Sequence, residues 1–181
     1  MIRLPRALVI GATSRNCGKT SFISQLTEQF SEFLPIAVKI KTLYPDDDSW
    51  HGSGRKLDSP FSIREELIDT GMKDSQRWLR SGAHKVYYIK SYHDSLESAI
   101  KIFLDQIPVA LPLIIESNSI RDFIEPSGFF VISDGEESNF KPSARRLLPL
   151  ADRIIKTDGE RHVPSTSELN IQWNSTKWLV G

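Results

Sequence analysis

Several features of secreted, membrane-bound and disulfide-stabilised proteins are missing from this sequence. It contains one cysteine, so no disulfide can form within the chain. The longest apolar run, at 107–115, is interrupted by Pro108 and Pro112 and falls far short of the roughly 20 residues that a membrane-spanning helix needs. The apolar stretch near the N-terminus is too short for a signal sequence. We therefore expect a cytoplasmic protein that does not bind membranes.

An excess charge of either sign is also lacking, as are the usual metal-ligand spacings. The chain has 23 Lys and Arg residues and 23 Asp and Glu residues, so no net field favours nucleic acid or an anionic membrane as a partner. Its four histidines are scattered, with no Cys-x-x-Cys or His-x-x-x-His pair. We expect no nucleic-acid partner and no metal other than the Mg²⁺ that a nucleotide brings.

The most informative segment is GATSRNCGKT at 11–20, which lies between an apolar run and a stretch with helical spacing. That is where a phosphate-binding loop belongs. Gly18 lets the backbone approach phosphate, Lys19 adds a positive charge, and Thr20 offers a hydroxyl to Mg²⁺. The alternative is a glycine turn that happens to precede a Lys-Thr pair. We expect the nucleotide to be bound by Thr13, Ser14, Arg15, Asn16, Cys17, Gly18, Lys19, Thr20 and Ser21.

The rest of the chain alternates between strand-like and helix-like patterns. This alternation predicts an α/β protein with the three-layer P-loop NTPase fold, a mostly parallel central sheet and a single domain over 1–181. We expect strands at 6–11, 36–42, 85–90, 109–116, 128–133 and 152–156, and helices at 22–33 (before Pro35), 74–82 (capped by Asp74), 94–107 and 144–150.

The segment at 43–63 differs from its neighbours because it is rich in Pro, Gly, Ser and charged residues and has no sustained period. Loops of this length in compact domains are usually functional or disordered. This one follows the end of a strand beside the predicted phosphate site. We expect it to be a loop that acts as a lid over a second substrate.

A carboxylate follows three aliphatic residues in LIIE at 113–116. This pattern is typical of the Walker B strand, whose acid holds the water shell of Mg²⁺ or orients the nucleophile. We therefore expect Glu116 to be catalytic and to bind Mg²⁺ with Thr20. The alternative is a solvent-exposed acid at the end of a strand.

Two lysines, Lys39 and Lys41, alternate onto the same side of the second predicted strand. Lysines on an inner strand are costly unless they face anions. We expect Lys39 to act with Lys19 in catalysis by neutralising phosphate or a carboxylate substrate. The alternative is that both side chains extend to solvent.

Two further aspartates are weaker candidates. Asp69 begins a segment of mixed charge, 69–77, in which Asp69 or Asp74 can contact Mg²⁺ and which can move with the γ-phosphate, although such charges also occur as ordinary helix caps. Asp158 follows Lys156 and Thr157, where guanine-specific P-loop proteins place a base-binding aspartate. The sequence leaves the choice between GTP and ATP open.

Three segments together, VIGATSRNCGKTSFISQL, AVKIKT and LIIES, resemble the SIMIBI class of P-loop NTPases. Within that class they resemble the molybdopterin-guanine dinucleotide biosynthesis protein B family. The resemblance implies a GTP-binding accessory protein of cofactor biosynthesis that forms a homodimer and works with a cofactor-synthesis protein.

Two other functions remain open. The loop and the lysine-bearing strand also resemble dethiobiotin synthetase, an ATP-dependent enzyme, which implies a kinase or ligase acting on a small molecule held by Lys39 or Lys41. The third possibility is a nucleotide-gated interaction module. All three functions require Mg²⁺ and a purine nucleoside triphosphate.

Overall fold

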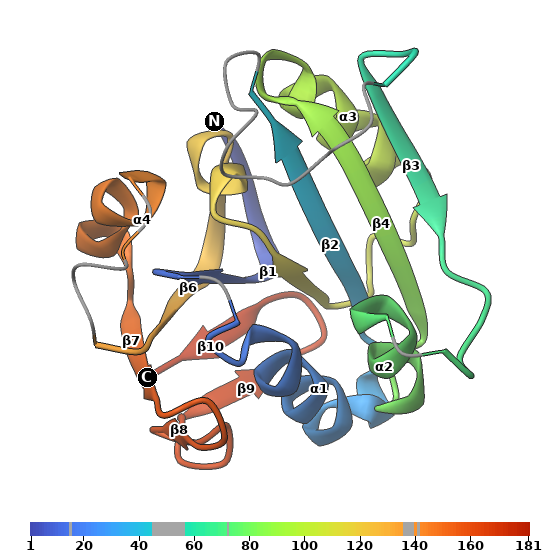
Figure 1. The fold of residues 1–181 in the computed structure, drawn as a ribbon. Coiled ribbons are helices and arrows are strands. Elements are labelled where there is room, and N and C mark those ends of the chain that lie inside the picture. The colour runs from blue at the N-terminus through green and yellow to red at the C-terminus, as the bar shows by residue number, and fades with distance from the viewer. Residues whose placement is uncertain (15, 45–56, 72, 136–139, 141) are drawn as a thin grey trace.

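A central sheet of eight strands organises the chain (Figure 1). The computed structural model describes residues 1–14, 16–44, 57–71, 73–135, 140 and 142–181. The strand order is β3-β4-β2-β5-β1-β6-β7-β8, and a separate two-stranded sheet pairs β9 with β10. The strands are β1 (Ile2–Ala12), β2 (Ile36–Leu43), β3 (Phe61–Glu65), β4 (Lys85–Tyr92), β5 (Leu113–Glu116), β6 (Ile124–Ser133), β7 (Arg153–Thr157), β8 (His162–Val163), β9 (Ile171–Trp173) and β10 (Trp178–Val180).

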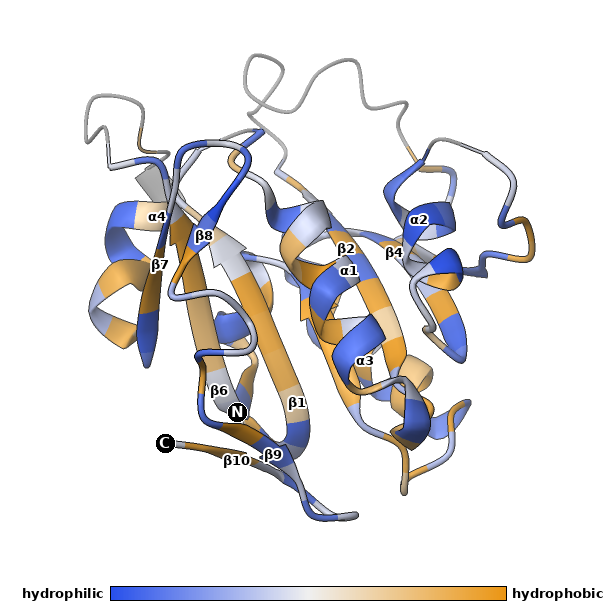
Figure 2. Cartoon of the chain, turned by 90° about the horizontal axis from the view of Figure 1, so that it is seen from below, coloured by the Kyte–Doolittle hydropathy of each residue, from blue (hydrophilic) through white to orange (hydrophobic). Residues whose placement is uncertain are grey.

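Helices cover both faces of this sheet. Side chains of α1 (Lys19–Gln29) and α2 (Asp74–Arg80) pack in one hydrophobic cluster with β1 and with the β9–β10 sheet. Side chains of α3 (Leu96–Asp105) and α4 (Pro142–Leu147) pack in a second cluster on the opposite face. The central strands carry most of the buried apolar residues, and Figure 2 shows their hydrophobic colouring. The predicted α/β architecture is confirmed.

All pairings between β4, β2, β5, β1, β6 and β7 are parallel, whereas β3 and β8 add antiparallel edges. The predicted mostly parallel sheet is therefore also confirmed. In parallel strands the carboxyl ends lie on one side of the sheet, where α/β proteins bind their ligands. The segments that follow β1, β2 and β5 meet at this side.

Several predicted boundaries were wrong. The first helix ends at Gln29, and Ser31–Phe33 form a separate 3-10 turn, which ends at Leu34 in a left-handed conformation with φ 55°. The strand predicted from 109 begins at Leu113, since Val109 is exposed and Pro112 precedes the strand. Asp74 is the first residue of α2, and Lys73 caps the helix.

The structure has further strands within the predicted loop at 43–63 and in the C-terminal segment after β7. Phe61 to Ile63 belong to β3, an edge strand that pairs antiparallel with β4. Residues 45–56, which carry most of the expected lid, lie outside the described residues. After β7 the chain forms β8, β9 and β10, and Trp178 of β10 is 2% exposed within the core. Among the described residues, no helix is both long and apolar enough to cross a membrane.

Candidate functional site

The loop between β1 and α1 has the backbone geometry of an anion-binding turn. Asn16 and Gly18 are both left-handed, with φ values of 58° and 79°, and Cys17 between them is not. Alternation of this kind points successive N–H groups into one concavity, where an anion is bound. The helix α1 starts directly afterwards at Lys19, so its free N–H groups face the same region. Arg15 lies outside the described residues.

The first half of the loop is fixed to the end of β6. The N–H of Thr13 donates to the Ile132 carbonyl over 3.0 Å, and the Ser14 hydroxyl donates to the Asp134 carboxylate over 2.6 Å. The thiol of Cys17, 3% exposed, points inward to the carbonyls of Ser14 and Ile132. These three residues therefore shape the loop with their side chains.

His162 of β8 supports the second half of the loop from below. Its Nε2–H donates to the Gly18 carbonyl over 3.1 Å, and its ring packs edge-on against Phe22 of α1. Burial lowers the pKa of His162, which keeps the imidazole neutral at pH 7. Its buried Nδ1 has no hydrogen-bond partner among the residues that the structure describes. A Cβ added to Gly18 would lie 2.8 Å from Nε2. Gly18 is thus required both by its φ and by the close approach of His162.

Asn118 joins the end of β1 to the segment after β5. Its side-chain amide donates to the Ala12 carbonyl over 2.9 Å, and its Oδ1 accepts the Ala12 N–H over 2.8 Å. The neighbouring Gly11 leaves room for this contact, since a Cβ there would lie 2.8 Å from Oδ1. Gly11 therefore serves packing at the strand end, seven residues before Gly18.

Lys39 of β2 forms ion pairs with two carboxylates opposite the loop. Its ammonium group donates a short hydrogen bond to Asp74 at the start of α2 and lies 3.2 Å from Oε2 of Glu116. Burial opposes the charge of Lys39, but the two carboxylates outweigh it and raise the pKa of the ammonium group. Lys39 therefore stays protonated and faces acids from two neighbouring elements.

Asp74 belongs to the same network. Burial alone would raise the pKa of its carboxyl group, yet hydrogen bonds from Lys39 and from the Thr20 hydroxyl hold the pKa below its usual value. The indole N–H of Trp78 donates to the Thr20 carbonyl over 3.2 Å, which fixes α2 against the start of α1. Of the two aspartates that the sequence offers as Mg²⁺ contacts, Asp69 and Asp74, the structure places Asp74 beside Thr20.

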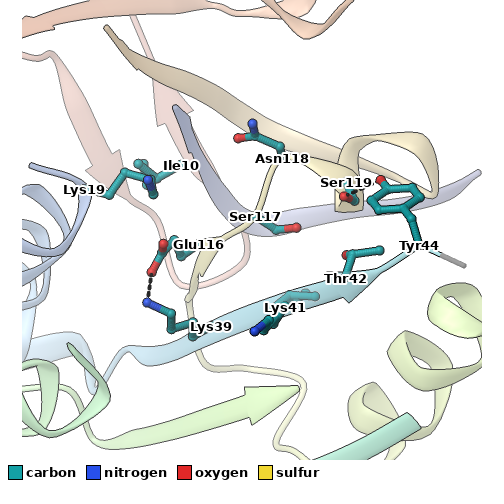
Figure 3. Close-up of a pocket in the computed structure, with 11 residues that line it drawn as sticks. Ile10, Lys19, Lys39, Lys41, Thr42, Tyr44, Glu116, Ser117, Asn118 and Ser119 are labelled. Carbon is teal, nitrogen blue, oxygen red and sulfur yellow. Dashed lines mark hydrogen bonds and ion pairs between the residues drawn. The ribbon is translucent and has the colours of Figure 1, made fainter. Parts of the chain in front are cut away.

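These side chains line one polar cavity of about 440 Å³ at the carboxyl end of the sheet. Its lining residues are Asn16, Cys17, Gly18, Lys19, Thr20, Ser21, Lys39, Asp74, Arg77, Glu116 and Gly159. A second cavity of about 210 Å³ shares Lys19, Lys39 and Glu116 and continues along the ends of β2 and β5 (Figure 3). In Figure 3 the side chains of Lys39 and Glu116 point toward each other, and Lys41 follows Lys39 along β2. The two cavities meet at Lys19, Lys39 and Glu116.

Two candidate site residues, Asp69 and Asp158, line neither of these cavities. Asp69 is exposed, and its backbone carbonyl accepts a hydrogen bond from Arg80. Asp158 is exposed in a turn after β7, where the N–H groups of Arg161 and Glu160 donate to its carboxylate and lower its pKa. Asp158 lines a separate cavity of about 450 Å³ at the ends of β6 and β7. The structure thus brings together Gly18, Lys19, Thr20, Lys39 and Glu116, but neither Asp69 nor Asp158.

The donor set suits a hydrated Mg²⁺ that also binds phosphate oxygens. Thr20, Asp74 and Glu116 supply oxygen ligands of the kind that Mg²⁺ prefers, and the buried Oε2 of Glu116 already faces a cation, the ammonium group of Lys39. Within the described part of the chain, no three His, Cys, Asp or Glu side chains lie close enough to hold a metal by themselves. A metal here would therefore need further oxygen ligands from a bound molecule.

A row of polar residues crosses the sheet at this site. Glu116 pairs in register with Lys39, Lys39 with Tyr88 of β4, and Tyr88 with Arg64 of β3. Residues in register share one face of a sheet, here the face that α1 and α2 cover. Burial and the charge of Glu116 raise the pKa of the Tyr88 phenol, while Lys39 acts in the opposite direction.

Sequence reasoning missed the roles of His162, Asn118, Tyr88 and Arg64. The amide of Asn118, two residues after the Walker B-like acid, was a usable signal, because an Asn there can bind a neighbouring strand end. The other three depend on strand pairing, which local patterns do not specify. Comparisons with family models, with curated proteins and with solved structures find no match to this chain.

Proposed function

We propose that this chain binds the Mg²⁺ complex of a purine nucleoside triphosphate at the loop 13–21 and hydrolyses it. One observation carries this proposal. The left-handed turn at Asn16 and Gly18, Lys19 at the helix start, and Lys39 and Glu116 from neighbouring strands all line the same polar cavity. A cavity with N–H groups, two lysines and a carboxylate suits a triphosphate and its metal.

Each residue has a definite role in this proposal. The N–H groups of the loop and the Lys19 ammonium group bind the β- and γ-phosphates. Lys39 neutralises charge that develops on the γ-phosphate, and its carboxylate partners keep it protonated. Glu116 orients the attacking water. Thr20, Asp74 and Glu116 would hold Mg²⁺, which supplies charge neutralisation and orients the phosphates.

The resemblance of the sequence motifs supports a more specific form of the proposal. In that form the chain is a GTP-binding accessory protein of molybdopterin-type cofactor biosynthesis, acting as a homodimer with a cofactor-synthesis protein. The turn that holds Asp158 lines the cavity at the ends of β6 and β7, which is the space available to a base. Because two backbone N–H groups both donate to Oδ1 of Asp158, this oxygen is already engaged, and we expect the contribution of Asp158 to guanine preference to be small.

The second cavity supports an alternative, an ATP-dependent kinase or ligase. It lies next to Lys19 and Glu116 and is lined by Lys41 and by the hydroxyl groups of Thr42, Ser117 and Ser119. A small acceptor with an anionic group fits such a lining. In this alternative, nucleotide consumption requires the acceptor, whereas an accessory GTPase responds to a protein partner.

Two variants and a matched control test the proposal. Lys19→Ala should lower the affinity for fluorescent GTP and ATP analogues at least tenfold, whereas Lys177→Ala, an exposed lysine in the β9–β10 turn, should leave it unchanged. Glu116→Gln should retain binding and slow phosphate release. Undiminished binding by Lys19→Ala would contradict the loop assignment, and an unchanged rate in Glu116→Gln would contradict the role of that carboxylate.

A further inference from the structure

A third cavity, of about 640 Å³, adjoins the proposed nucleotide site and shares Lys39 and Asp74 with it. It lies between α2, the edge strand β3 and its neighbour β4, and Arg64, Lys73 and Tyr88 contribute to its lining. Its volume is within the range of small-molecule sites, roughly 300–1,000 Å³. The described cavity thus has the size for a second ligand beside the phosphates.

The strand register connects this cavity to the nucleotide site. Arg64, Tyr88, Lys39 and Glu116 occupy paired positions on β3, β4, β2 and β5. Four neighbouring strands span about 14 Å at roughly 4.8 Å per step, and all four side chains lie on the face covered by α2. Lys39 is the third residue of this row and lines both cavities. A molecule bound beside Arg64 and extending along the row therefore points toward the phosphates.

The three acidic residues that line this cavity all have hydrogen-bond or ion-pair partners. Glu65 pairs with Lys85 over 3.0 Å and accepts the Tyr87 hydroxyl over 3.2 Å. Glu66 accepts the Ser75 hydroxyl over 2.9 Å, and Asp74 pairs with Lys39.

Of the three cations that line the cavity, Lys39 is paired with acids, whereas the other two are not paired with any described acid. Among the residues that the structure describes, Arg64 and Lys73 form no ion pair, although both line the cavity. The phenol of Tyr88 adds a hydrogen-bond donor between Arg64 and Lys39. Two unpaired cations and a phenol match a carboxylate or a phosphate group.

We propose that this cavity binds a small anionic molecule, a carboxylate or a phosphate ester, through Arg64, Lys73 and Tyr88. The ligand is the second substrate or effector of the proposed nucleotide site, and in that respect the inference rests on the proposed function. Its anionic group lies at Arg64 and Lys73, and its remainder points along the row toward Lys39. The guanidinium group supplies two parallel donors for such an oxygen pair.

Calorimetric titration tests the site with defined probes. The protein is first saturated with Mg²⁺ and ADP, so that added anions do not bind at the phosphate loop, and is then titrated with malonate or with glycerol phosphate. We expect saturable binding of one of these probes, with at least tenfold weaker affinity in Arg64→Ala and in Lys73→Ala. Binding of malonate alone identifies a carboxylate site, and binding of glycerol phosphate alone identifies a phosphate site.

Two controls keep this result separate from the nucleotide site. Arg3→Ala removes an exposed arginine at the start of β1 and should leave the probe affinity unchanged. Tyr88→Phe retains the ring and should weaken binding severalfold. The same titration with Lys19→Ala protein, without nucleotide, should give the same probe affinity, so it tests the anion site even if no nucleotide binds. Absence of saturable binding of both probes, or equal affinity in wild type and Arg64→Ala, would overturn the proposal.

Discussion

Replacement of Lys39 by methionine tests whether the Lys39–Glu116 pair is a coupled unit. The two groups are 3.2 Å apart, and their side chains are 28% and 12% exposed. At an effective dielectric constant near 20, their attraction is about 5 kcal/mol, and desolvation offsets much of it. Methionine fills the space of the lysine but leaves Glu116 without its cation. We expect Lys39→Met to lower the free energy of unfolding by about 2 kcal/mol.

The double variant gives the sharper result. Glu116→Gln alone should cost about 1 kcal/mol, because Lys39 keeps its bond to Asp74. Lys39→Met with Glu116→Gln should cost less than the sum of the single changes by about 1 kcal/mol, since neither charge is then left unpaired. Urea unfolding at pH 7 without nucleotide gives the free energy of unfolding of the wild type, the two single variants and the double variant.

The Lys85–Glu65 pair provides a matched control. It has a similar separation, 3.0 Å, but its side chains are 38% and 32% exposed. The cycle of Lys85→Met with Glu65→Gln should give a coupling of at most about 0.5 kcal/mol, because solvent screens exposed pairs. If the costs at Lys39 and Glu116 add within about 0.5 kcal/mol, the two residues do not form a coupled pair and the reasoning is refuted.

Three further predictions concern the loop, its support and the C-terminal sheet. Gly18→Ala should destabilise the protein and weaken nucleotide binding by more than Gly135→Ala does. Both positions are left-handed, with φ values of 79° and 82°, but of the two only Gly18 has a neighbouring side chain within contact distance of an added Cβ. Equal effects of the two substitutions in unfolding and binding assays would refute the close-contact argument. Burial lowers the pKa of His162, so below about pH 6.5 the unfolded chain binds a proton before the folded chain does. The free energy of unfolding should therefore fall as pH falls from 7 toward the lowered pKa, and it should fall by less in His162→Asn. Parallel pH profiles of the two proteins would contradict this. Trp178→Ala should lower the free energy of unfolding by about 3–5 kcal/mol, because this indole is buried and donates to the Arg6 carbonyl over 2.9 Å. Urea unfolding should show a smaller loss for Trp173→Ala, whose indole is half-buried. A Trp178 variant as stable as wild type would show that the tail does not stabilise the core.

Local patterns in the sequence predicted the centre of the fold well. The apolar strand β1, the short β-branched strand β2 and the acid-tipped β5 each follow from a run of suitable residues. The Gly-Lys-Thr triplet also predicted that a helix follows the loop, although α1 begins at Lys19 and not at 22. These features depend on residues close together in the chain, which is why periodicity and turn chemistry were sufficient.

Contacts between distant segments were not predictable in this way. His162 supports Gly18 from 144 residues away, and Tyr88 lies beside Lys39 only because β4 pairs with β2. The edge strand β3 is five residues long and mixes apolar and charged side chains, so its composition resembled that of the preceding loop. Asp74 rather than Asp69 reached Thr20 because the packing of Trp78 fixes the position of α2.

The most direct test of the account is calorimetric titration of the wild-type chain with GTP and with ATP in the presence of Mg²⁺. The account predicts saturable binding of at least one of them, with one site per chain, and loss of that binding in Lys19→Ala. If neither nucleotide gives saturable heat with the folded wild-type protein, the turn at Asn16 and Gly18 is not a phosphate-binding loop and the proposed function is wrong.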